Sequence, residues 1–102
     1  MHIYGMLSHM PAIKLFHKKQ IYHDGIIELV IWRLPRVNSE RPHGLKYRLV
    51  YVKNGKRLVG YDNERGKGDH KHIGEKESVY KFQSVDQLLK DFWNDVKRCD
   101  DE

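Results

Sequence analysis

The sequence has a single cysteine, Cys99, and no long apolar run. One thiol excludes an intramolecular disulfide framework, so a reducing compartment such as the cytoplasm is expected. No stretch approaches the ~20 apolar residues of a membrane-spanning helix, and the first residues lack the basic region and apolar core of a signal peptide. We therefore expect a cytoplasmic protein with no membrane contact.

The composition indicates one globular domain. With 39% hydrophobic and 11% aromatic residues, the chain is too apolar to be disordered, and its length of 102 residues suits one compact core. We assign residues 13–98 to a single domain, residues 1–12 to an N-terminal arm or tag remnant, and residues 99–102 to an acidic tail. Met1 and Met10 both remain candidates for the native start.

The net charge of +5 is unevenly distributed along the chain. Residues 1–60 carry eleven Lys and Arg against three Asp and Glu, whereas residues 61–102 carry eight against eleven. A surface field of positive sign attracts polyanions, of which phosphate backbones are the commonest. Nucleic-acid binding is therefore the first hypothesis, and the alternative is that the lysines only keep the protein in solution.

The N-terminal half predicts two β-hairpins. Residues 13–22 and 26–34 are rich in β-branched and aromatic residues, and Asp24-Gly25 between them suits a tight turn. The second run is almost continuously apolar, which predicts a strand at the sheet centre or covered on both faces. Residues 45–53 alternate in polarity, and Asn54-Gly55 predicts a type I′ turn into a strand over residues 56–62.

The C-terminal part predicts short strands followed by a helix. Residues 70–73 and 79–82 form either one further strand or two fragments with a turn at Gly74, and Ser84 is the expected N-cap of the helix. Apolar residues then recur at helical spacing: Val85, Leu88, Leu89, Phe92, Trp93 and Val96. The predicted fold class is α+β, an antiparallel sheet of four to five strands with one C-terminal amphipathic helix packed on it.

The segment from Tyr61 to His72 is dense in groups suited to phosphate chemistry. Gly66 and Gly68 allow backbone N–H groups to turn toward an anion, and the segment also supplies cations: Arg65, Lys67 and Lys71. Its spacing matches neither a nucleotide-binding P-loop nor a dinucleotide fingerprint. An anion site is therefore predicted, without a mononucleotide cofactor.

His70 and His72 share one face if they lie on a strand. Metal-independent RNA cleavage needs a base for the 2′-hydroxyl, an acid for the leaving oxygen and cations for the phosphorus centre, and histidine can fill the first two roles. Asp69 is predicted to orient one imidazole. The candidate catalytic residues are Arg65, Lys67, Asp69, His70 and His72.

Further residues are candidates for substrate binding: Tyr61, Lys71, Arg48 and Lys46. Tyr61 suits base stacking, and the three cations suit phosphates. The alternative for the two histidines is a structural or solvated pair, because His-x-His is common by chance. A metal site is disfavoured since two histidines and Asp69 have no further ligand close in sequence, so no metal or other cofactor is expected.

The run from Tyr61 to Gly74, with the strand of residues 47–51 before it and residues 80–82 and 88–92 after it, resembles the TumE-like toxins of bacterial toxin–antitoxin modules. The resemblance covers about residues 20 to 98. It implies a small toxin made beside an antitoxin with a helix-turn-helix DNA-binding domain, and it implies no catalytic residues. We predict a toxin that binds and cleaves RNA without a metal, the alternative being a non-enzymatic nucleic-acid- or protein-binding module. A homodimer remains possible.

Overall fold

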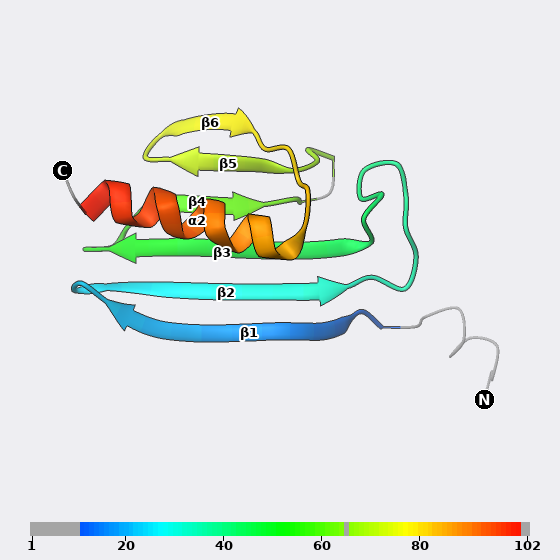
Figure 1. Cartoon of the computed structure of the whole chain (residues 1–102), viewed down its shortest axis with the longest axis horizontal. Coiled ribbons are helices and arrows are strands. Elements are labelled where there is room, and N and C mark those ends of the chain that lie inside the picture. Colours follow the sequence, from blue (N-terminus) through cyan, green and yellow to red (C-terminus); the bar gives the residue numbers. More distant parts are fainter. Residues whose placement is uncertain (1–10, 65, 101–102) are drawn as a thin grey trace.

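The computed structural model describes residues 11–64 and 66–100. It consists of a six-stranded antiparallel sheet with one helix across one face (Figure 1), and each strand pairs with its neighbours in the chain. The elements are β1 (Ile13–Tyr22), β2 (Gly25–Arg33), β3 (Leu45–Lys53), β4 (Lys56–Asp62), β5 (His70–Ile73), β6 (Lys76–Val79) and α2 (Val85–Asp100). The α+β prediction is confirmed, with one strand more than expected. No helix within the described ranges has the length and apolar character needed to cross a membrane.

Three turns set the strand boundaries, and the boundaries differ from the prediction at two of them. Asn54 (φ 53°) and Gly55 (φ 74°) form the predicted left-handed turn. In the first hairpin the left-handed residues are His23 and Asp24, one position earlier than expected. Gly25 instead opens β2, where a Cβ atom would lie 2.5 Å from the Tyr51 ring. The turn at Gly74 separates β5 from β6, which ends at Val79, so residues 80–82 are not a strand.

Strand β2 lies inside the sheet but is covered on one face only. Ile27, Leu29 and Ile31 are buried on the helix side, whereas Ile26 on the other side is 44% exposed. The strand is also second from the β1 edge rather than central. The expectation of a strand at the sheet centre or covered on both faces is therefore wrong on both alternatives, because β2 neighbours the edge strand and the apolar run places branched residues on a face that no described element covers.

Helix α2 begins where its N-cap was predicted. Ser84 Oγ accepts a hydrogen bond from the Gln87 backbone N at 3.1 Å, and the buried stripe of Leu88, Phe92 and Val96 packs on the sheet. The predicted acidic tail is partly helical, because Cys99 and Asp100 belong to the last turn. The arm at residues 1–10 and the end at residues 101–102 lie outside the described residues.

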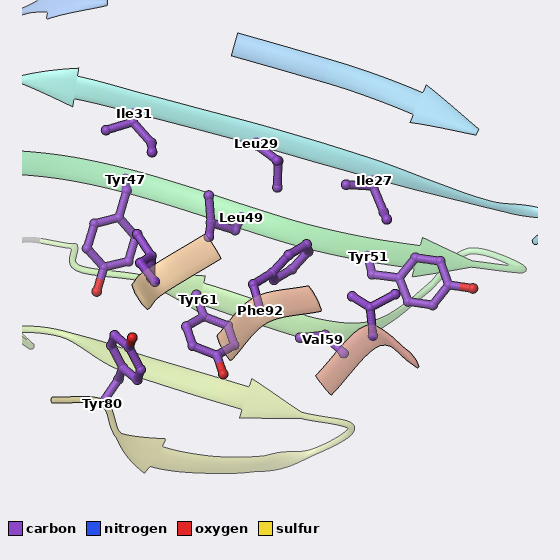
Figure 2. Packing of buried hydrophobic residues seen from close by; sticks show 12 residues of the cluster. Ile27, Leu29, Ile31, Tyr47, Leu49, Tyr51, Val59, Tyr61, Tyr80 and Phe92 are labelled. Carbon is purple, nitrogen blue, oxygen red and sulfur yellow. The ribbon is translucent and has the colours of Figure 1, made fainter. Parts of the chain in front are cut away.

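The core between α2 and the sheet combines aliphatic side chains with four tyrosine rings (Figure 2). Their hydroxyls reach carboxylates at the rim, so that Tyr51 Oη donates to Asp100 at 2.9 Å and Tyr80 Oη to Asp91 at 2.6 Å. Tyr61 Oη donates to the buried Asp95. Two of these tyrosine–aspartate bonds join the sheet to the helix, and the third joins the segment after β6 to the helix.

Candidate active site on the open sheet face

The sheet face opposite α2 is the open face, and strand register decides which side chains occupy it. In the β4–β5 pairing Asp62 lies opposite His70 and Gly60 opposite His72, and in the β5–β6 pairing His72 lies opposite Glu77. Alternation along each strand sends these side chains to the same side. We call Asp62, His70, His72 and Glu77 the histidine cluster.

The members of the histidine cluster lie within direct contact of one another. His70 Nε2 lies 2.7 Å from Asp62 Oδ1 and 3.5 Å from Glu77 Oε2. His72 Nε2 lies 3.2 Å from Glu77 Oε2, and the two imidazole rings are 5.1 Å apart between centroids. The predicted convergence of the two histidines is therefore present in the geometry.

His70 is the most buried member, with a side chain that is 7% exposed. Its Nδ1 lies 2.9 Å from the Gly68 carbonyl oxygen, which accepts the Nδ1–H. On the other side, Asp62 Oδ1 is buried and has no partner in hydrogen-bond geometry, although His70 Nε2 is near it. The ring is held at both nitrogens, one by backbone and one by a carboxylate.

An exposed cation, Arg57, lies beside His72. The Arg57 side chain passes across Gly60, where a Cβ atom would lie 2.9 Å from Arg57 Cδ, and Gly60 is the residue opposite His72. Burial and then the Arg57 charge lower the pKa of His72 from its usual value. His72 is thereby favoured as a neutral imidazole with a cation next to it.

A depression of about 320 Å³ opens beside the cluster. It is lined by Lys67, His70, Glu77, Ser78 and Val79. The predicted residue Lys67 is 59% exposed at its side chain, and its Nζ lies 3.6 Å from Glu77 Oε2. The depression therefore offers a place for a ligand between an exposed cation and the His70 ring.

Asp69 lies away from the histidine cluster. It accepts hydrogen bonds from Tyr47 Oη at 2.7 Å and from His43 Nε2 at 3.0 Å, while His43 Nδ1 accepts the Leu45 backbone N–H. Asp69 thus orients His43 and fastens the loop before β3. The predicted role of orienting His70 or His72 belongs by geometry to Asp62 and Glu77 instead.

Tyr61 and Lys71 lie on the helix side of the sheet. Tyr61 is 1% exposed and packs in the core, and Lys71 Nζ lies 3.3 Å from Asp95 and 5.6 Å from the Tyr61 ring centroid. A buried ring cannot stack on a base, so the substrate-binding role expected of Tyr61 does not fit its position. Arg65 lies outside the described residues.

Arg48 and Lys46 lie on the open face, next to the cluster. Arg48 is opposite Asp62 across the β3–β4 pair, and Lys46 is opposite Trp32, whose ring has Lys14 Nζ 4.9 Å from its centroid. Register places five cations of strands β1, β3 and β4 on this face, and we call them the basic strip: Lys14, Lys19, Lys46, Arg48 and Arg57. The strip leads across the sheet to the histidine cluster.

Sequence reasoning missed Asp62, Glu77 and Arg57. Asp62 and Glu77 are seven or eight residues from His70, and only hairpin register brings them to it. Alternation through two successive hairpins is the signal that points to both carboxylates. The sequence signal for Arg57 is weaker. It is Gly60, three positions later on the same strand, which leaves space for the Arg57 side chain.

A family model described as "Toxin TumE" matches residues 10–99 of the chain. Comparison with curated proteins found no match, and comparison with solved structures found none. The matched range spans the whole sheet and nearly all of α2.

Proposed function

Because the chain belongs to the TumE family, whose members are toxin components of toxin–antitoxin modules, we propose that it binds RNA on the open face and cleaves it at the histidine cluster without a metal. In this proposal a cognate antitoxin with a helix-turn-helix domain neutralises the toxin. The observation that carries the proposal is the convergence of two imidazoles, whose ring centroids are 5.1 Å apart, beside the Arg57 side chain and a depression.

The proposed reaction is an internal transesterification of the RNA backbone. The neutral His72 imidazole takes the proton of the 2′-hydroxyl, the 2′-oxygen bonds to phosphorus, and the bond from phosphorus to the 5′-oxygen breaks. Protonated His70 gives its Nε2 proton to the leaving 5′-oxygen. The products are a 2′,3′-cyclic phosphate and a 5′-hydroxyl, so atoms and protons balance.

Neighbouring groups support these roles. Asp62 and the Gly68 carbonyl hold the His70 ring in place, because each faces one of its nitrogens. The lowered pKa of His72 keeps it able to accept a proton near neutrality. Arg57 supplies positive charge for the oxygens on phosphorus.

RNA binding is supported by the basic strip and by Trp32. Backbone phosphates along the sheet would meet its five cations, and the partly exposed indole of Trp32 offers a surface for one base. An open antiparallel sheet face suits single-stranded RNA, whose bases are free to splay.

The test uses the purified full chain with single-stranded RNA in the presence of a chelator. Wild type is expected to give fragments ending in a cyclic phosphate, and His70→Gln and His72→Gln to lose at least ~100-fold in rate, the usual size of general acid–base catalysis. His17→Gln is the matched control, since His17 also faces a carboxylate on this face, with Nε2 3.0 Å from Glu28.

Circular dichroism confirms that each variant is folded. Full activity in both cluster variants would overturn the proposal. A mobility shift of RNA without any cleavage by wild type would instead favour the non-enzymatic binding module.

A further inference from the structure

The contact between His70 and Asp62 has an unusual electrostatic feature. Because His70 Nδ1–H donates to the Gly68 carbonyl, a neutral His70 points the lone pair of Nε2 at Asp62 Oδ1, 2.7 Å away. Two acceptors at this distance repel each other. Asp62 Oδ1 is buried and receives no hydrogen bond, so either a proton on His70 Nε2 or a bound cation would relieve the repulsion.

The surrounding atoms fit a tetrahedral metal ion. A zinc ion with bonds of ~2.0–2.1 Å to nitrogen and oxygen places its ligand atoms about 3.3 Å apart. Ligand atoms of Asp62, His70 and His72 all lie within 4.8 Å of one another. Glu77 Oε2 lies 3.5 Å from His70 Nε2 and 3.2 Å from His72 Nε2, close to the separation of neighbouring tetrahedral ligands.

The charges of the ligands and the hydrogen bond that orients His70 also fit a divalent metal ion. Two neutral imidazoles and two carboxylates balance the charge of a divalent ion. A metal-bound histidine typically donates its other N–H to a backbone carbonyl or carboxylate, which fixes the ring and its tautomer, and the Gly68 carbonyl does this for His70. The Glu77 side chain is 45% exposed, so it can close the fourth position or yield it.

We propose that Asp62, His70 and His72 bind one divalent transition-metal ion, with Glu77 as the fourth ligand. Binding itself does not depend on the function proposed above. Its effect on cleavage does rest on that function: an ion bound to Nε2 of both imidazoles removes the groups that transfer protons, so the ion inhibits the toxin.

The binding test is calorimetric titration of zinc chloride into the full chain stripped with chelator. One ion per chain is expected, and Asp62→Asn and His70→Gln are each expected to weaken binding at least tenfold. His17→Gln is the control, because His17 and Glu28 form a histidine–carboxylate pair on the same face that has no second imidazole in the described structure. Cobalt(II) absorption in the visible range reports tetrahedral coordination separately from affinity.

The results overturn or support the site without reference to RNA. The proposed metal site would be overturned if Asp62→Asn and His72→Gln were both folded and bound zinc as tightly as wild type. Thermal melting of the metal-free variants shows that any loss is not a failure to fold, and a zinc-induced rise in melting temperature confined to wild type and His17→Gln would support it.

RNA cleavage with chelator and with stoichiometric zinc then separates the two proposals. If RNA is cleaved in the presence of chelator and added zinc abolishes the cleavage, both the proposed function and the metal site are supported. Zinc binding in a protein that never cleaves RNA supports the metal site and overturns the proposed function. Cleavage that requires zinc supports the site and overturns the inhibitory role together with the metal-free mechanism.

Discussion

Gly60 shows how one residue shapes the candidate site. Its φ is not positive, so its importance lies in space rather than backbone freedom. The missing side chain leaves room for Arg57 to lie across the strand next to His72. The exposed Arg57 side chain thereby lies over the sheet face, and it has no ion pair of its own in the described structure.

Replacing Arg57 with Gln is expected to lower the cleavage rate on the order of a hundredfold, because the variant lacks a preorganised charge near the phosphate. Gly60→Ala is expected to lower it as well, since the new Cβ would meet Arg57 Cδ at 2.9 Å and displace that side chain with its charge intact. Single-turnover cleavage assays measure both effects.

Arg36→Gln, in an exposed loop, is the control for net charge. Zinc binding should survive in Arg57→Gln, because Arg57 is not a proposed ligand. A cleavage rate that Arg57→Gln and Gly60→Ala both leave unchanged would remove Arg57 from the mechanism.

At the scale of elements, hairpin turns and the helix stripe could be predicted from sequence, as could the pairing of the two histidines, whereas the carboxylates that face them could not. Asn54-Gly55 and the apolar spacing from Leu88 to Val96 are local signals, and both are confirmed. The site depends on how far β5 slides along β4 after the loop of residues 63–69, and a slip of one residue would send His70 to the other face.

The predicted roles of Asp69 and Tyr61 do not fit the structure for a different reason. Both are close in sequence to the histidines, yet alternation turns Tyr61 into the core and the loop carries Asp69 to His43. Proximity in sequence therefore does not imply proximity in space in this segment. The carboxylates that do face the imidazoles come from neighbouring strands.

The bonds between tyrosines of the sheet and aspartates of α2 make the helix contact sensitive to alkali. Burial first, and then the hydrogen bond to Asp100, raise the pKa of Tyr51 to about 12. An unfolded tyrosine has a pKa of ~10. The stabilisation is therefore complete below pH ~10 and disappears as pH rises through the higher folded pKa.

The free energy of unfolding is accordingly expected to fall between pH ~10 and about 12. Tyr51→Phe should make this fall shallower, although burial also raises the pKa values of Tyr47, Tyr61 and Tyr80. Urea titrations at several pH values measure the free energy of unfolding, and tyrosinate absorbance reports the ionisation of the tyrosines. An identical slope in wild type and Tyr51→Phe would contradict the assignment.

The whole molecule has two unlike faces. Helix α2 contributes carboxylates to the covered side, where tyrosines and Lys71 engage them. The open face carries the basic strip and the histidine cluster. The charge asymmetry between the two halves of the sequence thus becomes an asymmetry between surfaces, because the basic strip comes from residues 1–60 while the carboxylates that the tyrosines bind come from α2.

RNA affinity should therefore depend on the open face and on salt. Lys46→Glu and Arg48→Glu are each expected to weaken RNA binding and to make its salt dependence less steep. The slope of log affinity against log salt should change by about 0.7 for each phosphate of single-stranded RNA that the variant no longer neutralises. Lys97→Glu changes net charge equally on the exposed side of α2 and should leave the slope nearly unchanged. Fluorescence anisotropy with a labelled single-stranded RNA over a series of salt concentrations measures both quantities.

Equal weakening in all three variants would mean that net charge alone attracts RNA, and the open face would then have no role as the binding surface.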